Sequence, residues 1–143
     1  MNYEKITAFL IFIASLLLFL LLNEFNSLAD YKLIANEKVN LLENTASNFE
    51  VISLIICALL WVWSNFVIIK TKQYFWLFLP FVFMCFCVVC SCKMSNEIFS
   101  FKKQNGLWNG SFSVTYIAGI FGILLTGIAL LINYLTLKKV ISK

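Results

Sequence analysis

Residues 113–137 read SVTYIAGIFGILLTGIALLINYLTL, and this stretch decides the fold of the chain. It carries no charged side chain and exceeds the ~20 apolar residues that a helix needs to cross the hydrocarbon core of a membrane. Within it, small or polar residues recur at alternating spacings of four and three, which places them along one face of a helix. Small side chains let helix backbones approach closely in lipid, so this seam predicts a helix-packing or oligomer interface. The seam consists of Thr115, Gly119, Gly122, Thr126, Ala129, Asn133 and Thr136.

Three further runs, residues 6–22, 51–69 and 74–92, are equally free of charged side chains. Hydrophobic residues make up 62% of the sequence and charged residues 13%, well below the ~25% charged residues of soluble domains. The sequence therefore predicts an all-α membrane protein, a single domain over residues 1–143 with four transmembrane helices in one antiparallel bundle. The first run is longer than the apolar core of a signal peptide, so we expect a retained helix. A soluble enzyme, a nucleic-acid-binding protein and a secreted disulfide-linked domain are not expected.

The lysines predict the orientation, since the chain has no arginine. An arrangement with both termini inside places a short lysine-bearing turn and a lysine-bearing tail at helix ends on the cytoplasmic side, as the positive-inside rule requires. These residues, Lys70, Lys72, Lys138 and Lys139, are also the predicted docking site for a soluble cytoplasmic partner. Heavy use of Lys, Asn, Ile and Phe is typical of AT-rich bacterial genes, so the expected location is the bacterial inner membrane.

Two outer loops are predicted, over residues 23–50 and 93–112. The first has no Pro or Gly and repeats apolar residues at helical spacing, so we expect a helix that continues into the second transmembrane helix or lies on its own bundle. In the second, Asn105-Gly106 between two apolar segments predicts a short β-hairpin, because type I′ turns favour residues that tolerate positive φ. Asn109-Gly110 follows as another turn signal.

Polar groups inside the apolar runs predict contacts between helices. Asn65 and its neighbour Ser64 lie within residues 51–69, where an amide is costly unless it is hydrogen-bonded, so Asn65 is expected to face another helix. Asn133 lies at a similar depth in the expected topology and is the partner that we predict. Pro80 predicts a kink in the third helix, because proline removes a backbone donor and crowds the preceding turn.

No catalytic site, metal site or cofactor is expected. The chain has no histidine and no carboxylate within residues 6–22, 51–69, 74–92 or 113–137, which removes the usual proton shuttles and coupling sites of membrane enzymes and transporters. One helix cannot turn all four sulfurs of the third run to a single ion, so its cysteines are expected to act as small apolar residues. The cysteines of the chain are Cys57, Cys85, Cys87, Cys90 and Cys92.

Three functions fit these features. The first is a non-enzymatic membrane subunit that forms homo-oligomers and anchors or senses for an effector protein; its general layout resembles that of membrane components of bacterial anti-phage defence systems. The second is an immunity protein against a pore-forming bacteriocin or membrane toxin, with the seam facing the toxin. The third is a small channel or holin-like pore, although no ring of charge would set ion selectivity. The seam equally fits the central helix of a monomeric bundle. Membrane lipid surrounds the chain in every case, and no direct contact with nucleic acid is expected.

Overall fold

The computed structural model describes residues 3–108 and 115–141, and these are almost entirely helical. Four long helices follow one another: α1 (Tyr3–Asp30), α2 (Ala35–Thr71), α3 (Phe78–Gln104) and α4 (Thr115–Ile141), with a 3-10 segment, η1 (Tyr74–Leu77), before α3. All four are long and apolar enough to cross a membrane, and the described residues contain no strand. The chain is therefore an all-helical, multi-pass membrane protein.

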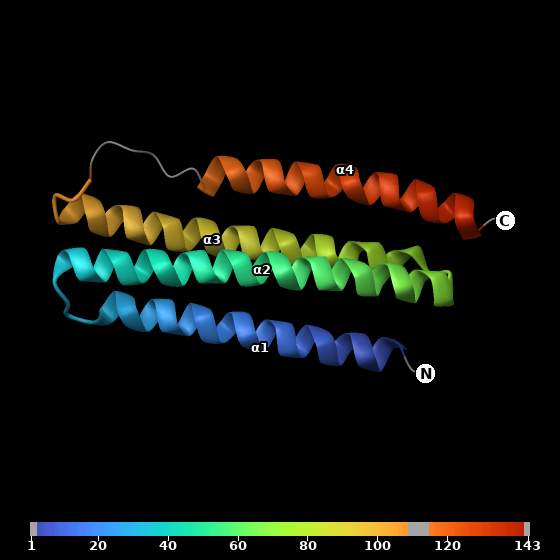
Figure 1. Ribbon diagram of the computed structural model, residues 1–143, viewed down its shortest axis with the longest axis horizontal. Coiled ribbons are helices and arrows are strands. Elements are labelled where there is room, and N and C mark those ends of the chain that lie inside the picture. Colours follow the sequence, from blue (N-terminus) through green and yellow to red (C-terminus); the bar gives the residue numbers. More distant parts are fainter. Residues whose placement is uncertain (1–2, 109–114, 142–143) are drawn as a thin grey trace.

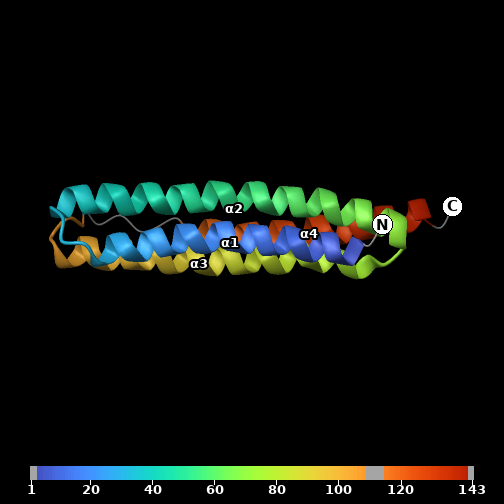
Figure 2. The same ribbon diagram turned by 90° about the horizontal axis from the view of Figure 1, so that it is seen from below.

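The helices run side by side along one axis, and both termini lie at the same end of the molecule, here called the terminal end (Figure 1). At the other end, here called the loop end, α1 connects to α2 and α3 leads toward α4 (Figures 1 and 2). The main core is shared by α1, α2 and α3, so α4 lies at the periphery. This core consists of Ala14, Leu18, Phe25, Leu42, Phe49, Leu60, Phe83, Cys87, Met94 and Ile98.

Near the terminal end, two smaller contacts join the helices. Ile68 of α2, Leu77 of η1 and Leu137 of α4 form a second buried cluster, which fixes the last turns of α4. On the opposite side of α2, the indole Nε1 of Trp63 donates a hydrogen bond of 2.8 Å to Thr7 Oγ1 and so joins α2 to α1. At the terminal end α4 is therefore attached to both α2 and η1.

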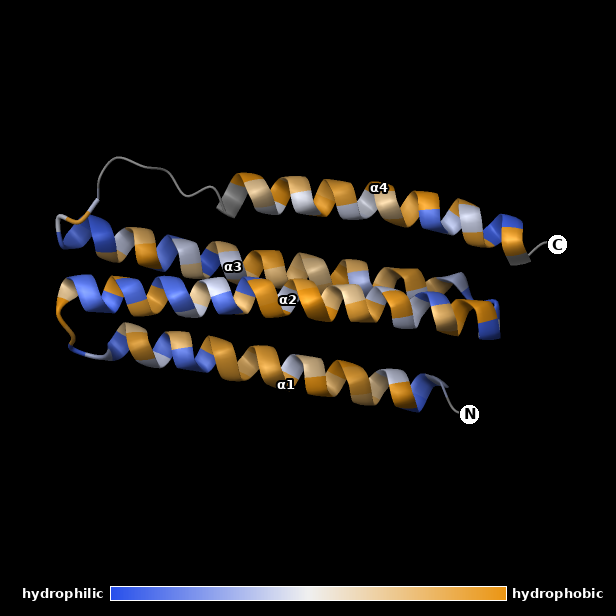
Figure 3. Ribbon diagram, in the orientation of Figure 1, coloured by the Kyte–Doolittle hydropathy of each residue, from blue (hydrophilic) through white to orange (hydrophobic). Residues whose placement is uncertain are grey.

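The first three helices are longer at the loop end than the sequence predicts. α1 ends at Asp30 rather than residue 22 and α2 begins at Ala35 rather than residue 51, so the predicted loop 23–50 is helical almost throughout and its second part continues into the second membrane helix. At ~1.5 Å per residue, α2 is about 55 Å long, against ~30 Å of hydrocarbon. Its first part therefore projects beyond the membrane, and hydrophilic residues gather there (Figure 3).

The predicted β-hairpin in residues 93–112 is wrong. α3 continues to Gln104, and Asn105 and Gly106 follow it as a helix cap, with Gly106 at φ 69°. Met94 and Ile98 belong to the main core, and this packing favours continuation of the helix over the local strand preference. In the Asn105-Gly106 pair, the glycine supplies the left-handed residue that ends many helices. The second pair, Asn109-Gly110, lies outside the described residues.

Pro80 lies in the first turn of α3, directly after η1, rather than inside one continuous α-helix as expected, and the kink at this residue stays a prediction. α3 begins at Phe78, so Pro80 occupies the first turn, where a helix has no bond for the missing N–H. The residues before it form η1, in which the Phe78 N–H bonds to the carbonyl of Phe75, three residues back. α2 ends similarly sharply, because Lys72 adopts a left-handed φ of 58° and its N–H caps α2.

Candidate functional site

The first half of the α4 seam packs against α3 of the same chain. A Cβ added to Gly119 would lie 2.7 Å from Val88 Cγ1, and one added to Gly122 would lie 3.5 Å from Met84 Cε. The missing side chains therefore allow the two helices to approach each other closely. At these two positions the helix-packing surface predicted from the sequence is used within one chain.

The second half of the seam turns away from α3. Thr126 is half-buried, whereas Ala129 and Thr136 are exposed. The seam residues repeat every 3.5 positions on average, whereas a straight α-helix has 3.6 residues per turn, so the seam rotates around the helix by ~20° per heptad. Its later residues therefore no longer lie on the face that contacts α3. Both threonine hydroxyls donate to the carbonyl one turn earlier, so neither needs a partner from another helix. Thr115 begins α4, and its side chain lies outside the described residues.

An amide pair joins α4 to α2 in the apolar part of the molecule. Asn133 Nδ2 donates a hydrogen bond of 2.8 Å to Asn65 Oδ1, which is the partnership expected from the sequence. Asn65 Nδ2 in turn donates to the carbonyl of Trp61 at 2.9 Å. Ser64 behaves differently from its neighbour, since it is buried and its hydroxyl has no hydrogen-bond partner among the described residues.

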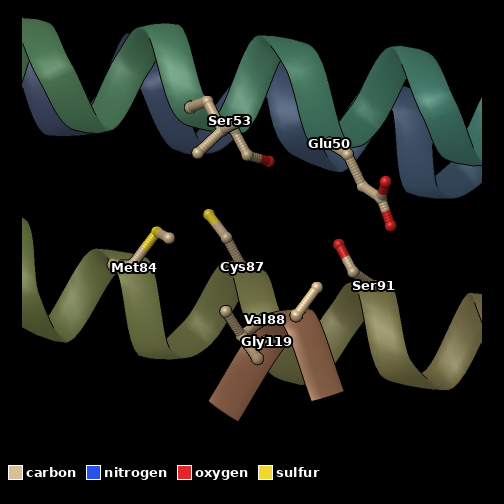
Figure 4. A pocket seen from close by; sticks show the side chains of 9 residues that line it. Glu50, Ser53, Met84, Cys87, Val88, Ser91 and Gly119 are labelled. Atoms are coloured by element: carbon tan, nitrogen blue, oxygen red, sulfur yellow. The ribbon is translucent and has the colours of Figure 1, made fainter. Parts of the chain in front are cut away.

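A cavity with a polar end lies between α2, α3 and α4, with a volume of about 300 Å³. Glu50 on α2 faces Ser91 on α3 across it, and Ser53, one turn further along α2, faces Cys87 (Figure 4). Ser53 is 3% exposed, and its hydroxyl lies beside the Cys87 thiol without a nitrogen or oxygen partner among the described residues. Glu50 is half-buried and forms no ion pair with any described residue. Three oxygen-bearing side chains therefore line this cavity, and no cation from residues 3–108 or 115–141 pairs with the carboxylate of Glu50.

A second, more apolar cavity of about 550 Å³ continues from the first toward the terminal end. Leu54 and Met84 line both cavities, so the two form one continuous groove. Its sides are α2 and α4, where Trp61 and Ala129 line the apolar part, and α3 forms its floor. We call this feature the α2–α4 groove; it combines an acidic, hydroxyl-bearing end with an apolar remainder.

Glu50 and Ser91 are members of this site that the sequence does not identify. Residue 50 lies in the predicted outer loop 23–50, and residue 91 lies in a cysteine-rich run. The spacing of Glu50 and Ser53 places them on one helix face, and the helix expected within residues 23–50 that continues into the second membrane helix was the available signal. The register of α3 against α2, which brings Ser91 opposite them, has no signal in the sequence.

The cysteines form no metal site in the described part of the chain, which has no cluster of three or more metal-binding side chains. None of the five cysteines forms a disulfide within the described residues; Cys87 is buried and the others are half-buried. Cys57 and Cys87 interact across the interface of α2 and α3. They pack there as small polarisable side chains.

The four lysines predicted to dock a partner lie at the terminal end. Lys70 and Lys72 stand where α2 ends, and Lys138 and Lys139 stand in the last turn of α4. All four side chains are exposed, and the ends of α2 and α4 lie at the same end of the molecule (Figure 1). The fold therefore presents both pairs on one surface.

The loop end is tied together by a buried lysine. Lys38 of α2 is 8% exposed, and its Nζ donates to two carbonyl oxygens at the end of α1. The same Nζ lies 4.9 Å from the ring centroid of Phe101 on α3, a cation–π contact. Lys102 of α3 also pairs with Glu43 of α2. These contacts join all three helices beyond the membrane-spanning region into one projecting unit.

Three features of the structure bear on function. They are the helical projection at the loop end, the peripheral position of α4, and the α2–α4 groove. No family model, curated protein or solved structure matches this chain, so the proposed function rests on these features alone.

Proposed function

We propose that this chain is a small, non-enzymatic membrane subunit that senses a change at its loop end and reports it through α4 to a partner protein. The observation that supports this most is the uneven attachment of α4. Only 6% of the apolar window of α4 is buried in the molecule, against 28% for α2. A peripheral helix can shift relative to the other three at a small cost in packing, whereas α1, α2 and α3 share the main core.

In this proposal, a displacement of the projecting unit at the loop end is transmitted through α4 to the lysines at the terminal end. The loop end is a compact unit held by Lys38 and by the buried side chains of Phe25 and Phe49, so it can transmit a displacement as one body. α4 follows it in the chain and ends with Lys138 and Lys139. A soluble effector with an acidic surface would bind these lysines together with Lys70 and Lys72.

The proposed orientation places both termini in the cytoplasm of a bacterium, with the loop end outside the inner membrane. The lysines at the ends of α2 and α4 support it through the positive-inside rule. Assembly with further copies would use the outward apolar face of α4, since Gly119 and Gly122 are already packed on α3. A sensor of this layout suits an anti-phage defence system, in which a membrane disturbance must reach a soluble effector.

An immunity protein against a pore-forming toxin is the second candidate. The observation in its favour is the α2–α4 groove, which opens at the side of the helices and has an apolar section of about 550 Å³. A toxin helix could enter there by helix–helix recognition within the bilayer. A pore has less support, because Asn133 bonds to Asn65 inside the chain and is not available to line a channel.

The test is the mass and composition of the complex purified in mild detergent from its host, with the neighbouring genes expressed. We expect a defined complex that contains a soluble protein, and we expect Lys138→Gln/Lys139→Gln to release that protein. The matched control is Lys32→Gln/Lys103→Gln, which removes the same charge from exposed lysines at the loop end. A chain that purifies alone and protects cells against a pore-forming toxin would instead establish the immunity function.

A further inference from the structure

We propose that the α2–α4 groove binds one phospholipid with a primary-ammonium headgroup, of the phosphatidylethanolamine class. The ammonium group occupies the cavity formed by Glu50, Ser53 and Ser91, and one acyl chain lies along the apolar part of the groove. The lipid belongs to the leaflet nearest the loop end. This inference does not depend on the proposed partner protein.

The polar end of the groove matches an ammonium group in charge and in hydrogen bonding. A primary ammonium carries three N–H donors and one positive charge. The cavity presents three oxygen-bearing side chains, one of them the carboxylate of Glu50, which has no ion pair among the described residues. The buried Ser53 hydroxyl has the Cys87 thiol, a weak hydrogen-bonding group, beside it and no nitrogen or oxygen partner among the described residues. A single ammonium ion would satisfy the carboxylate with charge-assisted hydrogen bonds and the hydroxyl at the same time.

The cavity lies at the depth of lipid headgroups. Glu50 immediately precedes the uncharged run 51–69 on α2, and Ser91 stands two residues before Lys93, the first charged residue that follows the uncharged run of α3. Both side chains therefore mark the edge of the hydrocarbon. α4 begins at Thr115, shortly before Gly119, which lines the same cavity. The positive end of its helix dipole favours the headgroup phosphate on that side.

The apolar part has the length of one leaflet. From Glu50 to Trp61, α2 rises about 16 Å at ~1.5 Å per residue, and half of the ~30 Å hydrocarbon core is about 15 Å. Both residues line the groove, one at each end. An acyl chain that starts at the headgroup therefore runs the full length of the groove and ends near the middle of the bilayer.

A helix from a second copy fits the groove less well than a lipid. Such a helix would bring apolar side chains against the carboxylate of Glu50 and bury it without a partner, which is strongly unfavourable. A bare metal ion would leave most of the combined volume, about 300 Å³ and 550 Å³ in the two parts, unfilled. A headgroup with its chain fills both parts and pairs the charge.

The experiment is native mass spectrometry of the full chain released from nanodiscs that contain phosphatidylethanolamine, phosphatidylcholine and phosphatidylglycerol with identical acyl chains. The choline headgroup is positively charged but has no N–H donor, so phosphatidylcholine tests the hydrogen bonds to the headgroup. Phosphatidylglycerol has no ammonium group, so it tests the positive charge. We expect one retained phosphatidylethanolamine, favoured about tenfold over phosphatidylcholine, which is the loss expected for one charge-assisted hydrogen bond. Glu50→Gln should abolish this preference, whereas the control Glu37→Gln, an exposed carboxylate of the same helix, should keep it.

Ser53→Ala provides a second variant that leaves the helices packed, since it removes one buried hydroxyl whose contact among the described residues is with the weakly hydrogen-bonding Cys87 thiol. It should reduce the preference for phosphatidylethanolamine several-fold, less than Glu50→Gln does. Equal retention of the three lipids, or a preference that survives Glu50→Gln, would overturn the proposal and leave only ordinary surrounding lipid. A lipid-free dimer that persists in Glu50→Gln would also overturn it, since a second copy would then fill the groove. Neither result bears on binding of a soluble partner at the lysines.

Discussion

Gly119→Ala should weaken the packing of α4 on α3 more than any other glycine-to-alanine change in α4. The added Cβ would lie 2.7 Å from Val88 Cγ1, whereas carbon atoms pack best at ~3.5–4.0 Å. The two helices must therefore separate locally by about 1 Å at this point. Val88 cannot easily swing aside, because β-branched side chains in helices are restricted to one main rotamer.

The expected cost is about 1–3 kcal/mol, the usual range for inserting a methyl group into a packed interface. In a soluble helix, alanine would recover ~1 kcal/mol through its better helix propensity. That gain is largely absent here, because a membrane-spanning helix that loses its contact with its neighbours remains helical. In lipid its backbone N–H and C=O groups have no other hydrogen-bond partners. The steric term therefore dominates the result.

The assay is reversible unfolding in mixed detergent micelles, followed by tryptophan fluorescence, with the shift in midpoint converted to free energy. Gly127→Ala is the matched control, since its added Cβ would meet Phe81 at 3.9 Å, an ordinary contact. It should change stability by less than ~0.5 kcal/mol. Val88→Ala combined with Gly119→Ala should recover most of the loss, giving a coupling energy of about 0.5–3 kcal/mol.

Two results would refute this reasoning. If Gly119→Ala and Gly127→Ala shift the midpoint equally, α4 does not approach α3 at Gly119. If Val88→Ala fails to rescue Gly119→Ala, the methyl group meets something other than Val88. In either case the seam would be free for contact with a second copy, and the mass of the assembly, rather than the stability of one chain, should respond to Gly119→Ala.

Three further predictions concern polar contacts. Lys38→Met should destabilise the loop end by about 2 kcal/mol, since it removes charged hydrogen bonds to the end of α1, and faster hydrogen exchange in residues 25–35 would show it. Asn133→Leu should cost less than ~2 kcal/mol, and adding Asn65→Leu should cost little more, because the two amides act as a pair; additive losses in the unfolding assay would contradict the bond. Glu43→Gln should cost less than ~1 kcal/mol, and the difference should disappear in high salt, because its pair with Lys102 is partly exposed.

The membrane class and number of helices were predictable because they depend on local composition. An uncharged run of about 20 residues must form a helix in lipid wherever its neighbours lie. Helix ends outside the lipid were predictable only in part: apolar residues at helical spacing indicated the helix within residues 23–50 that continues into α2, but not the continuation of α3 to Gln104. Residues 35–50 and 93–104 are helical because Phe49, Met94 and Ile98 bury against one another and against α1, and in water such tertiary contacts decide whether a polar segment stays helical.

The sequence by itself determined that four apolar segments cross the membrane and that Asn65 and Asn133 need partners, because lipid imposes both conditions on each residue separately. The tertiary structure decided which surfaces meet. It packed Gly119 and Gly122 on α3, left Ala129 exposed beside the α2–α4 groove, and placed Glu50 and Ser91 on opposite sides of that groove. The reason is that every face of these transmembrane helices is apolar enough to contact lipid. Hydrophobicity therefore does not determine which face of a helix packs against its neighbours. Only the close fit of particular side chains, such as Val88 against a glycine, selects the face that packs.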